Sequence, residues 1–482
     1  MKPARSLAAS ALALLGACSQ IPPYQPPTTP DAPQWRETAP GWMAAAPADT
    51  LARGPWWALF GDATLDALVP QVAVSNQNVA AARAAVAQSQ ALVREQRAAF
   101  FPTLGLSGTA TRAGVGGSVS TGSKAGGSSF SATGNRFTLG LDASWEPDVW
   151  GRVSAGVAAA EASAQASTAD LANATLSAQA AFVSDYLSLR EADAEIAILG
   201  TTIGGYERAL QITRNRYAAA IAQKSDVLQA KTTLANAQAD LAGVAQGRAA
   251  LLHAMAVLAG QAPATFQLPP GDWAATAVPA VPVGVPSTLL QRRPDIAAAE
   301  RAVAAANADI GVARSAWFPA LTLSGSLQQN ASSLTHLFDA SSTTWSFGLA
   351  IAETIFDGGL RSAQVDAARA AWEGTVAQYR ATVLTAFQAV EDQLSAAATL
   401  EEQQARRREA SEAADQTEAQ MLNRYREGIV AYTDVVTAQV TALQARRALL
   451  QVSLQRQTAA VAMITALGGG WTTAQLAADA GR

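Results

Sequence analysis

The feature that most constrains the fold of this chain is an internal duplication. Residues 97–108 match residues 314–325 at an arginine, an aromatic pair, a proline, two leucines, a serine and a glycine. A second block, residues 215–230, matches residues 423–438 in the same order. Two ordered pairs of matches indicate that a unit of roughly 210 residues occurs twice, so the chain should fold as two copies of one plan.

Each copy contains a pair of segments in which apolar and small polar residues alternate. The pairs occupy residues 103–145 and 320–352. Pro102 and Pro319 precede them and end the helix before each pair, because the residue before a proline is displaced from the α region; the first of these helices is expected over residues 63–99. Each alternating segment is about ten residues long, the length of a tilted transmembrane strand.

Two observations favour membrane strands over the alternative of a soluble amphipathic hairpin. The polar faces carry almost only small uncharged residues, and Trp145 and Trp345 lie at strand ends, where an aromatic girdle is found. The loops expected over residues 113–135 and 328–343 are placed outside the cell. Four strands cannot close a barrel, and an open sheet edge has no hydrogen-bonding partner in lipid, so the chain must oligomerise. A dimer is the minimum and a trimer gives twelve strands.

Long helical segments without glycine or proline clusters follow each strand pair. The expected helices cover residues 153–217 and 225–259 in the first copy and 362–426 and 433–467 in the second. At 1.5 Å per residue, the longer helices reach about 100 Å. No compact domain has a core of that length, so these helices should pack side by side as a bundle. A fibrous coiled-coil spacer is the alternative.

The N-terminus has the pattern of a secreted lipoprotein. Residues 1–17 combine Lys2 and Arg5 with an apolar run and small residues, which predicts a signal peptide. Cys18, the only cysteine, follows Leu-Gly-Ala, which resembles a lipobox. This predicts a covalent lipid on Cys18 after cleavage, with an ordinary free thiol as the alternative. By resemblance to bacterial lipoproteins, Ser19 favours the outer membrane.

Composition gives little support to an enzyme or to a nucleic-acid-binding protein. The formal net charge is −4, without a basic patch for nucleic acid. The two histidines, His253 and His336, are far apart in the sequence, and a single cysteine excludes an intramolecular disulfide. The nearest phosphate-loop look-alike, residues 117–124, lies between two strands and not before a helix. We therefore expect no catalysis, no metal and no cofactor apart from the lipid.

The chain resembles the TolC-like outer-membrane factors of tripartite efflux systems, in particular their NodT-like lipoprotein branch. The resemblance covers residues 18–471, and the block at residues 290–296 is its most specific motif. The other motifs are the proline-rich residues 22–27, the Trp56-Trp57 pair with Phe60, Asp62, Leu65 and Leu68, the two aromatic-Phe-Pro blocks, and Trp145-Glu146 with Asp148 and residues 150–152.

The resemblance implies an α+β membrane protein built of two tandem repeats. Three chains would form a twelve-stranded outer-membrane β-barrel, continuous with a long periplasmic α-helical barrel. Drugs, toxic compounds or metabolites would pass passively from the periplasm of a Gram-negative bacterium to the exterior. The implied partners are outer-membrane lipid, a periplasmic adaptor (membrane fusion) protein and an inner-membrane pump, expected to be proton-driven. A type I protein secretion duct and a coiled-coil lipoprotein without a channel remain the alternatives.

These expectations divide the chain into six parts. They are a signal peptide (1–17), a lipid-anchored extended segment (18–62), a first repeat (63–262), a linker or equatorial belt (263–286), a second repeat (287–467) and a C-terminal tail (468–482).

The turns between the long helices are the expected place for a periplasmic gate. Asp226 and Asp434 are equivalent in the two copies, so a trimer brings up to six carboxylates together. They would form a cation-favouring constriction, or a lock if they pair with Arg216, Arg424 or Arg426. In the alternative interpretation they only begin helices, with the hydroxyls of Ser225 and Thr433 as N-caps and the carboxylates favoured by the helix dipole. Both can hold.

The resemblance also makes these turns the contact with the adaptor, through Arg216, Tyr217, Arg424, Tyr425 and Gly428. Ala220 stands where the second copy has Gly428, so a positive φ at this position would strain the first turn. Arg292, Arg293 and Asp295 are interpreted as structural residues that mark a helix start at Pro294.

Overall fold

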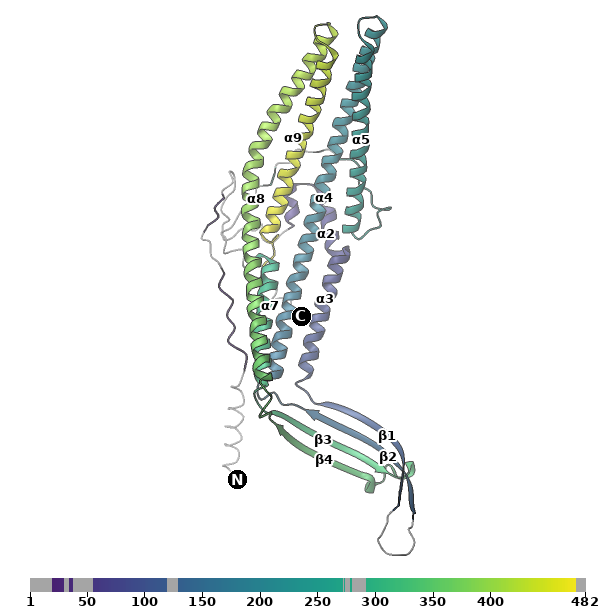
Figure 1. Ribbon diagram of the computed structural model, residues 1–482, viewed down its shortest axis with the longest axis vertical. Helices are drawn as coiled ribbons and strands as arrows, with labels where there is room; N and C mark the ends of the chain where they lie inside the picture. Colours follow the sequence, from purple (N-terminus) through teal and green to yellow (C-terminus); the bar gives the residue numbers. More distant parts are fainter. Residues whose placement is uncertain are drawn as a thin grey trace. The chain divides into compact units, whose positions relative to one another are not determined.

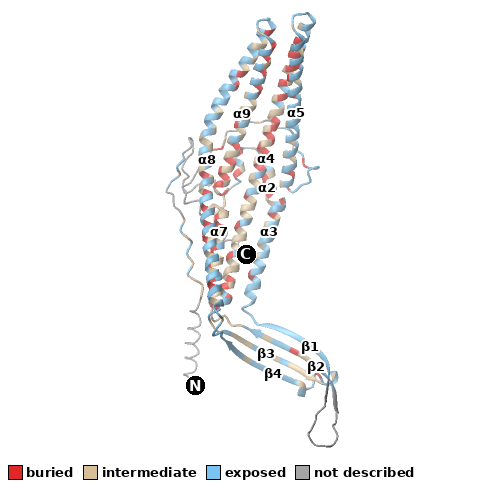
Figure 2. Cartoon of the chain, viewed as in Figure 1, coloured by how far each residue is buried: buried red, intermediate tan, exposed pale blue. Residues whose placement is uncertain are grey.

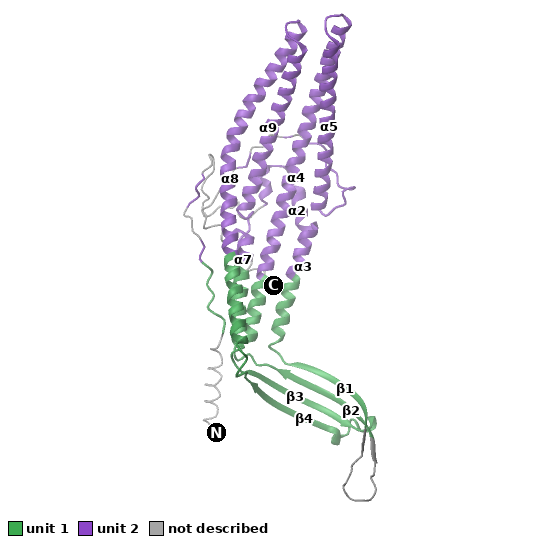
Figure 3. Cartoon of the chain, in the orientation of Figure 1, with its two compact units in different colours: residues 1–27, 87–164, 300–377 green, residues 28–86, 165–299, 378–482 purple. Residues whose placement is uncertain are grey.

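The computed structural model describes residues 20–29, 34–37, 55–118, 129–271, 273, 278–279 and 292–473. The predicted signal peptide, Cys18, much of the predicted linker and most of the tail lie outside these residues. The chain divides into two compact units (Figure 3). The first comprises Met1–Pro27, Ala87–Ala164 and Glu300–Ala377, and the second Thr28–Val86, Gln165–Ala299 and Gln378–Arg482. Each unit contains segments of both sequence copies, so the two units do not correspond to the two copies.

The first unit contains a four-stranded antiparallel sheet in the order β1-β2-β3-β4 (Figure 1). The strands are β1 (Thr103–Ser118), β2 (Ser129–Trp145), β3 (Ala320–Ala331) and β4 (Thr343–Ala352). Pairing of β2 with β3 joins the two predicted strand pairs into one sheet. β1 and β2 are longer than predicted, because much of the loop expected over residues 113–135 continues the ladder.

The register aligns apolar side chains across all four strands. Leu106 pairs with Leu141, Leu141 with Leu327, and Leu327 with Trp345. Successive side chains of a strand point to opposite faces of the sheet. The neighbouring row therefore lies on the other face, and it consists of Gly105, Asp142, Ser326 and Ser346. Leu106 is 74% exposed in the single chain. One face of the sheet is therefore apolar and uncovered, and the other is polar.

The long helices repeat in length between the two copies. α4 (Arg152–Ala218) and α8 (Leu360–Arg426) both have 67 residues, and α5 (Lys224–Leu258) and α9 (Tyr432–Ala466) both have 35. All four predicted long helices are present, with ends displaced by no more than two residues. The remaining elements are η3 (Trp56–Phe60), α2 (Ala63–Ser75), α3 (Gln77–Ala98), α7 (Pro294–Ser315) and two short 3₁₀ turns, η5 (Leu334–His336) and η6 (Ala340–Ser342).

The single helix predicted over residues 63–99 is wrong, because the chain breaks at Asn76 into α2 and α3. Asn76 is extended, with φ −65° and ψ 129°. Its Oδ1 accepts hydrogen bonds from the N–H groups of Asn78 and Val79 at 2.9 and 3.1 Å. Its Nδ2 donates to the carbonyl of Leu258 at 2.9 Å. One buried side chain thus caps α3 and satisfies the end of α5.

The buried residues of the second unit follow the facing sides of its helices (Figure 2). Phe182, Leu189 and Leu199 of α4 and Met463 of α9 are fully buried. By contrast, α5 is the one described helix with the length and composition to cross a membrane, and the most apolar part of it is only 11% buried. An exposed apolar helix of this kind is also what packing against another subunit requires.

Candidate functional site

The two turns that join the long helices have the same backbone structure. In the first turn, the N–H groups of Ala220 and Ile221 donate to the carbonyls of Tyr217 and Arg216 at 2.9 and 2.8 Å. The second turn repeats this pattern with the equivalent residues, at 3.0 and 2.9 Å: Gly428 to Tyr425 and Ile429 to Arg424. The sequence duplication therefore extends to single hydrogen bonds at the helix ends.

The predicted strain in the first turn is confirmed. Gly428 has φ +79° and Ala220 has φ +59°, the one positive φ at a non-glycine position in the described chain. A side chain in this left-handed conformation costs roughly 1 kcal/mol relative to glycine. The first turn thus stores strain that the second avoids.

An aromatic cluster forms the core beside the second turn. The rings of Tyr425 and Tyr432 meet edge to face, with centroids 5.2 Å apart. They are 3% and 2% exposed and pack with Leu210, Ala230 and Val435. Burial raises the pKa of Tyr432 to about 12, so its hydroxyl stays neutral at physiological pH. Tyr432 escaped the sequence prediction because the equivalent residue of the first copy is Lys224, which breaks the repeat.

Arg216 joins the end of α4 to the end of α8. Its Nη1 donates to the carbonyls of Tyr425 and Arg426 at 2.9 and 3.1 Å. Its guanidinium carbon lies 4.7 Å from the centroid of the Tyr425 ring. These carbonyls lie in the last turn of α8. Carbonyls there have no N–H partner inside the helix and lie at the negative end of its dipole. Arg216 is therefore a C-cap supplied by another helix.

The described residues contain no Arg–Asp lock within one chain. Arg216 bonds to carbonyls, and Arg426 donates to Asn423 Oδ1 at 3.3 Å. No ion pair in the described part of the chain involves Asp226 or Asp434. A lock of the predicted kind would have to form between subunits.

The predicted N-caps of the second helices are wrong by two residues. The N-cap positions are Gln223 and Ala431 rather than Ser225 and Thr433, and neither N-cap side chain bonds to the helix backbone. At the second turn, burial of the adjacent Tyr432 is worth more than a hydroxyl cap of about 1 kcal/mol. The two hydroxyl residues consequently lie inside the first helical turn.

Asp226 and Asp434 both occupy the third position of their helix. Asp434 Oδ2 accepts a hydrogen bond from the N–H of Ala431 at 3.2 Å. Both carboxylates lie at the positive end of a helix dipole, as the alternative interpretation proposed. Asp434 is exposed and Asp226 is partly exposed, so both also remain accessible to ions.

The residues predicted to contact an adaptor differ in accessibility. Tyr425 is buried and Arg216 is partly buried. Tyr217 is 48% exposed, and Arg424 and Gly428 are exposed. Only the last three offer their surface to a partner.

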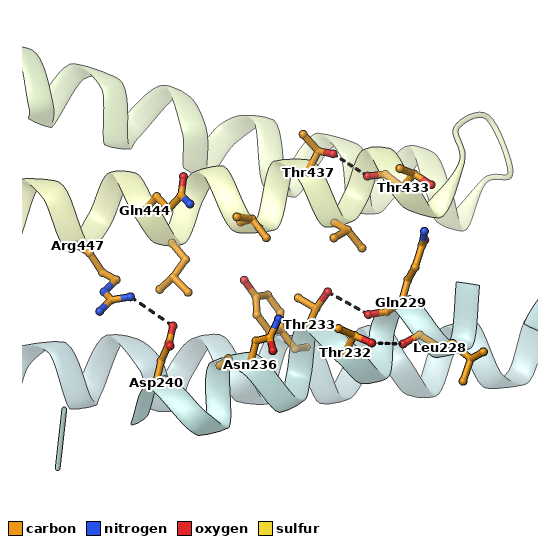
Figure 4. A pocket seen from close by; sticks show the side chains of 15 residues that line it. Leu228, Gln229, Thr232, Thr233, Asn236, Asp240, Thr433, Thr437, Gln444 and Arg447 are labelled. Carbon is orange, nitrogen blue, oxygen red and sulfur yellow. Dashed lines mark hydrogen bonds and ion pairs between the residues drawn. The ribbon is translucent and has the colours of Figure 1, made fainter. Parts of the chain in front are cut away.

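A groove of about 680 Å³ lies between α5 and α9 next to the turns (Figure 4). Small polar side chains such as Thr232 and Thr437 line it, and their hydroxyls donate to carbonyls of their own helices at 2.9 and 3.0 Å. Away from the turns it is bounded by Asp240, which pairs with Arg447 at 3.3 Å. The lining is therefore close to neutral.

The Arg-Arg-Pro-Asp block has the predicted structural role. α7 begins at Pro294, and Arg293 pairs with Asp295 at 2.6 Å. Arg293 Nη1 also donates at 2.9 Å to the carbonyl of Ala466, the last residue of α9. The block thus connects the start of α7 to the end of α9.

An apolar exposed sheet face combined with duplicated long helical hairpins defines a TolC-like outer-membrane duct. The sequence pattern described as "Outer membrane efflux protein" matches residues 68–261 and 285–469. The chain therefore belongs to the outer membrane efflux protein family.

Individual relatives agree with this assignment. The chain is 32% identical to the toluene efflux pump outer membrane protein TtgC of Pseudomonas putida, over 97% of this chain and 95% of that protein. It is 32% identical to the outer membrane protein OprJ of Pseudomonas aeruginosa, over 98% and 97% of the two chains. The solved outer-membrane channel OprN superposes with a TM-score of 0.82 at 30% identity, over 93% of this chain and 99% of that one.

These comparisons confirm the predicted family, the predicted α+β trimeric channel fold and the predicted role in efflux. They do not favour a secretion duct or a coiled-coil lipoprotein without a channel. The family consists of transport proteins of the outer membrane of Gram-negative bacteria, which extend into the periplasm.

Proposed function

We propose that three copies of this chain form the outer duct of a tripartite pump, whose turns between the long helices close the pore and receive a periplasmic adaptor. The adaptor would link the duct to a proton-driven inner-membrane pump. The cargo would be small molecules, in keeping with relatives named for the efflux of antibiotics and of toluene. Because the pump selects the cargo, the duct itself needs little specificity.

The observation that supports a gate is that the two aspartates are accessible and lack an arginine partner within the described chain. Asp226 and Asp434 are accessible, and no arginine of the described chain neutralises them. Around a threefold axis they form a ring of up to six carboxylates. A ring of carboxylates at the narrowest point of a pore makes that constriction selective for cations.

The support for adaptor contact is the exposed part of the same turns. Tyr217, Arg424 and Gly428 offer an aromatic ring, a cation and bare backbone to a partner. The neutral groove between α5 and α9 next to them has room for side chains of a docked helix.

Lipid on Cys18 would give the protein a second attachment to the membrane, in addition to the barrel. A single acyl chain binds a bilayer only marginally, so anchoring is firm when it acts together with a membrane-spanning sheet. Mass spectrometry of the mature N-terminal peptide tests this directly. A diacylated or triacylated Cys18 is expected, whereas an unmodified thiol on the mature protein would remove the anchor from the proposal.

The gate is tested by replacing Asp226 and Asp434 together with alanine and measuring ion conductance in planar bilayers. The proposal predicts a higher conductance and a weaker cation preference, because the carboxylate ring is gone. Glu412→Ala, an exposed carboxylate of α8 away from the turns, is the matched control and should change neither. Unchanged conductance and unchanged ion preference in the double variant would remove the gate role.

A further inference from the structure

The duplicated turns contain two equivalent binding arrangements, and among the described residues of a single chain one of them is complete. Arg216 and Tyr425 form the complete one, with the guanidinium stacked on the ring and bonded to the end of α8. Their counterparts in the other copy are Arg424 and Tyr217. Arg424 is exposed, and Tyr217 is 48% exposed. In a single chain, therefore, the Arg424 side chain does not cap a described helix, and the Tyr217 ring is not covered by an arginine.

Ring closure brings the two unused halves together. In a closed ring, every first copy has the second copy of its own chain on one side and the second copy of the neighbouring chain on the other. A head-to-tail interface that closes into a ring repeats in the same sense at each step. Within a chain, the first copy contacts the second copy. The second copy should contact the first copy of the partner subunit in the same way.

We propose that Arg424 of one subunit caps helix α4 of the partner subunit. Its guanidinium would stack on the ring of Tyr217 and donate to the carbonyls of Tyr217 and Ala218. These are the counterparts of the two carbonyls that Arg216 uses. The inference rests on the trimeric fold and is independent of any gate role of the aspartates. In a trimer with this contact, Tyr217 and Arg424 are engaged between subunits, and Gly428 is the exposed residue of the three that is left for an adaptor.

The receiving end has the chemistry that this contact needs. The Tyr217 carbonyl accepts a hydrogen bond from the N–H of Ala220, and a carbonyl has a second lone pair for another donor. It belongs to the last turn of α4, where the dipole favours a cation. A Tyr217 ring placed like the equivalent Tyr425 ring, which lies 4.7 Å from Arg216, would add a cation–π contribution.

The substitution of alanine for glycine in the first turn is compatible with this contact. A Cβ atom added to Gly428 would lie 3.6 Å from Arg216 Nη2, an ordinary van der Waals distance. The methyl group of Ala220 therefore leaves room for Arg424 in the equivalent position. Lys224, however, replaces the second ring that Tyr432 supplies within the chain. The contact between subunits lacks that packing and should be weaker than the one inside the chain.

A photo-crosslinking experiment on the full-length chain in outer membranes tests the proposal. Tyr217 is replaced with the photoreactive residue p-benzoylphenylalanine, and trimers are assembled from a mixture of light and isotope-labelled chains. Crosslinks between light and labelled chains should map to residues 424–427. The same probe at Arg214, an exposed position on α4, is the control for non-specific capture. Crosslinks confined to one chain, or mapping to another region, would overturn the proposal.

A double-mutant cycle gives an independent readout that does not depend on the photoreactive residue. Arg424→Ala and Tyr217→Ala are made singly and together, and the temperature at which trimers dissociate in detergent is measured for each. The proposal predicts that the double variant loses less than the sum of the single losses, because the two residues act through one contact. Arg408→Ala, another exposed arginine of α8, should be additive with Tyr217→Ala. Additive effects for Arg424 would contradict the contact, whereas a change in conductance alone bears only on the gate.

Discussion

Replacing Arg216 with alanine should loosen the end of α8 without unfolding the chain. The side chain makes two charge-assisted hydrogen bonds to helix-end carbonyls and one cation–π contact. Hydrogen bonds to charged groups contribute about 1.5–3 kcal/mol each, and a partly exposed cation–π contact about 0.5–1 kcal/mol. Water replaces part of this at a partly buried site, so we expect a net local loss of about 2–3 kcal/mol.

Native-state hydrogen exchange measures this loss at single amides. The N–H groups of Gly428 and Ile429 close the turn that Arg216 supports, so their exchange reports its opening. A loss of 2–3 kcal/mol corresponds to exchange faster by about 30- to 150-fold. The equivalent amides of the first turn, Ala220 and Ile221, donate to the backbone carbonyls of Tyr217 and Arg216. Arg216→Ala keeps both carbonyls, so these two amides should keep their exchange rates.

Two variants complete this experiment. Arg214→Ala, an exposed arginine of the same helix, should leave the amides of the second turn unchanged. Arg216→Lys keeps the charge but not the planar fork, so its effect should lie between those of wild type and alanine. Unchanged exchange at Gly428 and Ile429 in Arg216→Ala, or equal acceleration in both turns, would refute the assignment of Arg216 as the cap of α8.

Three further predictions concern other parts of the chain. Leu106→Arg should lower the yield of outer-membrane trimers, because arginine at a lipid-facing strand position costs up to roughly 4 kcal/mol. Ser107→Arg, on the opposite face, should be tolerated, and equal losses of yield would contradict the assignment of the faces. Gly260→Ala should destabilise the chain by about 3 kcal/mol or more in thermal unfolding, since the new Cβ would lie 2.1 Å from the Ser75 carbonyl oxygen. Gly61→Ala, at a similar φ but in open space, should cost only about 1 kcal/mol, and similar costs for the two would argue against the close approach. Burial and the charge of Glu195 raise the pKa of Glu191 from 4.5 to about 6, with Arg447 opposing. Protonation is thus easier in the folded state, and the stabilisation that it gives is complete below pH 4.5 and lost as the pH rises through 6. Glu191→Gln should therefore unfold at a higher temperature than wild type near pH 7.5 and at a similar one near pH 4, and a difference that does not vary with pH would contradict this.

The duplication in the sequence predicted the strands and long helices well, because both depend on periodic burial. Alternation sets which strand residues share a face, and long segments free of proline and glycine clusters set helix length. The conditional expectation at Ala220 also followed from the sequence, since glycine in one copy marks a backbone conformation that the other copy must share.

What the sequence did not predict depends on contacts between distant residues. Asn76 interrupts a continuous apolar periodicity, and its role appears only when Leu258 is placed beside it. Arg216 looked like a partner for aspartates because charge was the only criterion, whereas the structure places helix-end carbonyls within its reach. The helix starts were misplaced because local capping propensity was weighed without the burial of Tyr432.

Three chains together enclose one pore, since four strands per chain cannot close a barrel. Single-channel recording of purified full-length trimers in planar bilayers tests this most directly. One conductance level for each inserted trimer is the predicted result. Three equal, independently closing levels would mean one pore per chain, and trimers that conduct in no variant, including the one without the two aspartates, would mean no pore; either result would contradict the account.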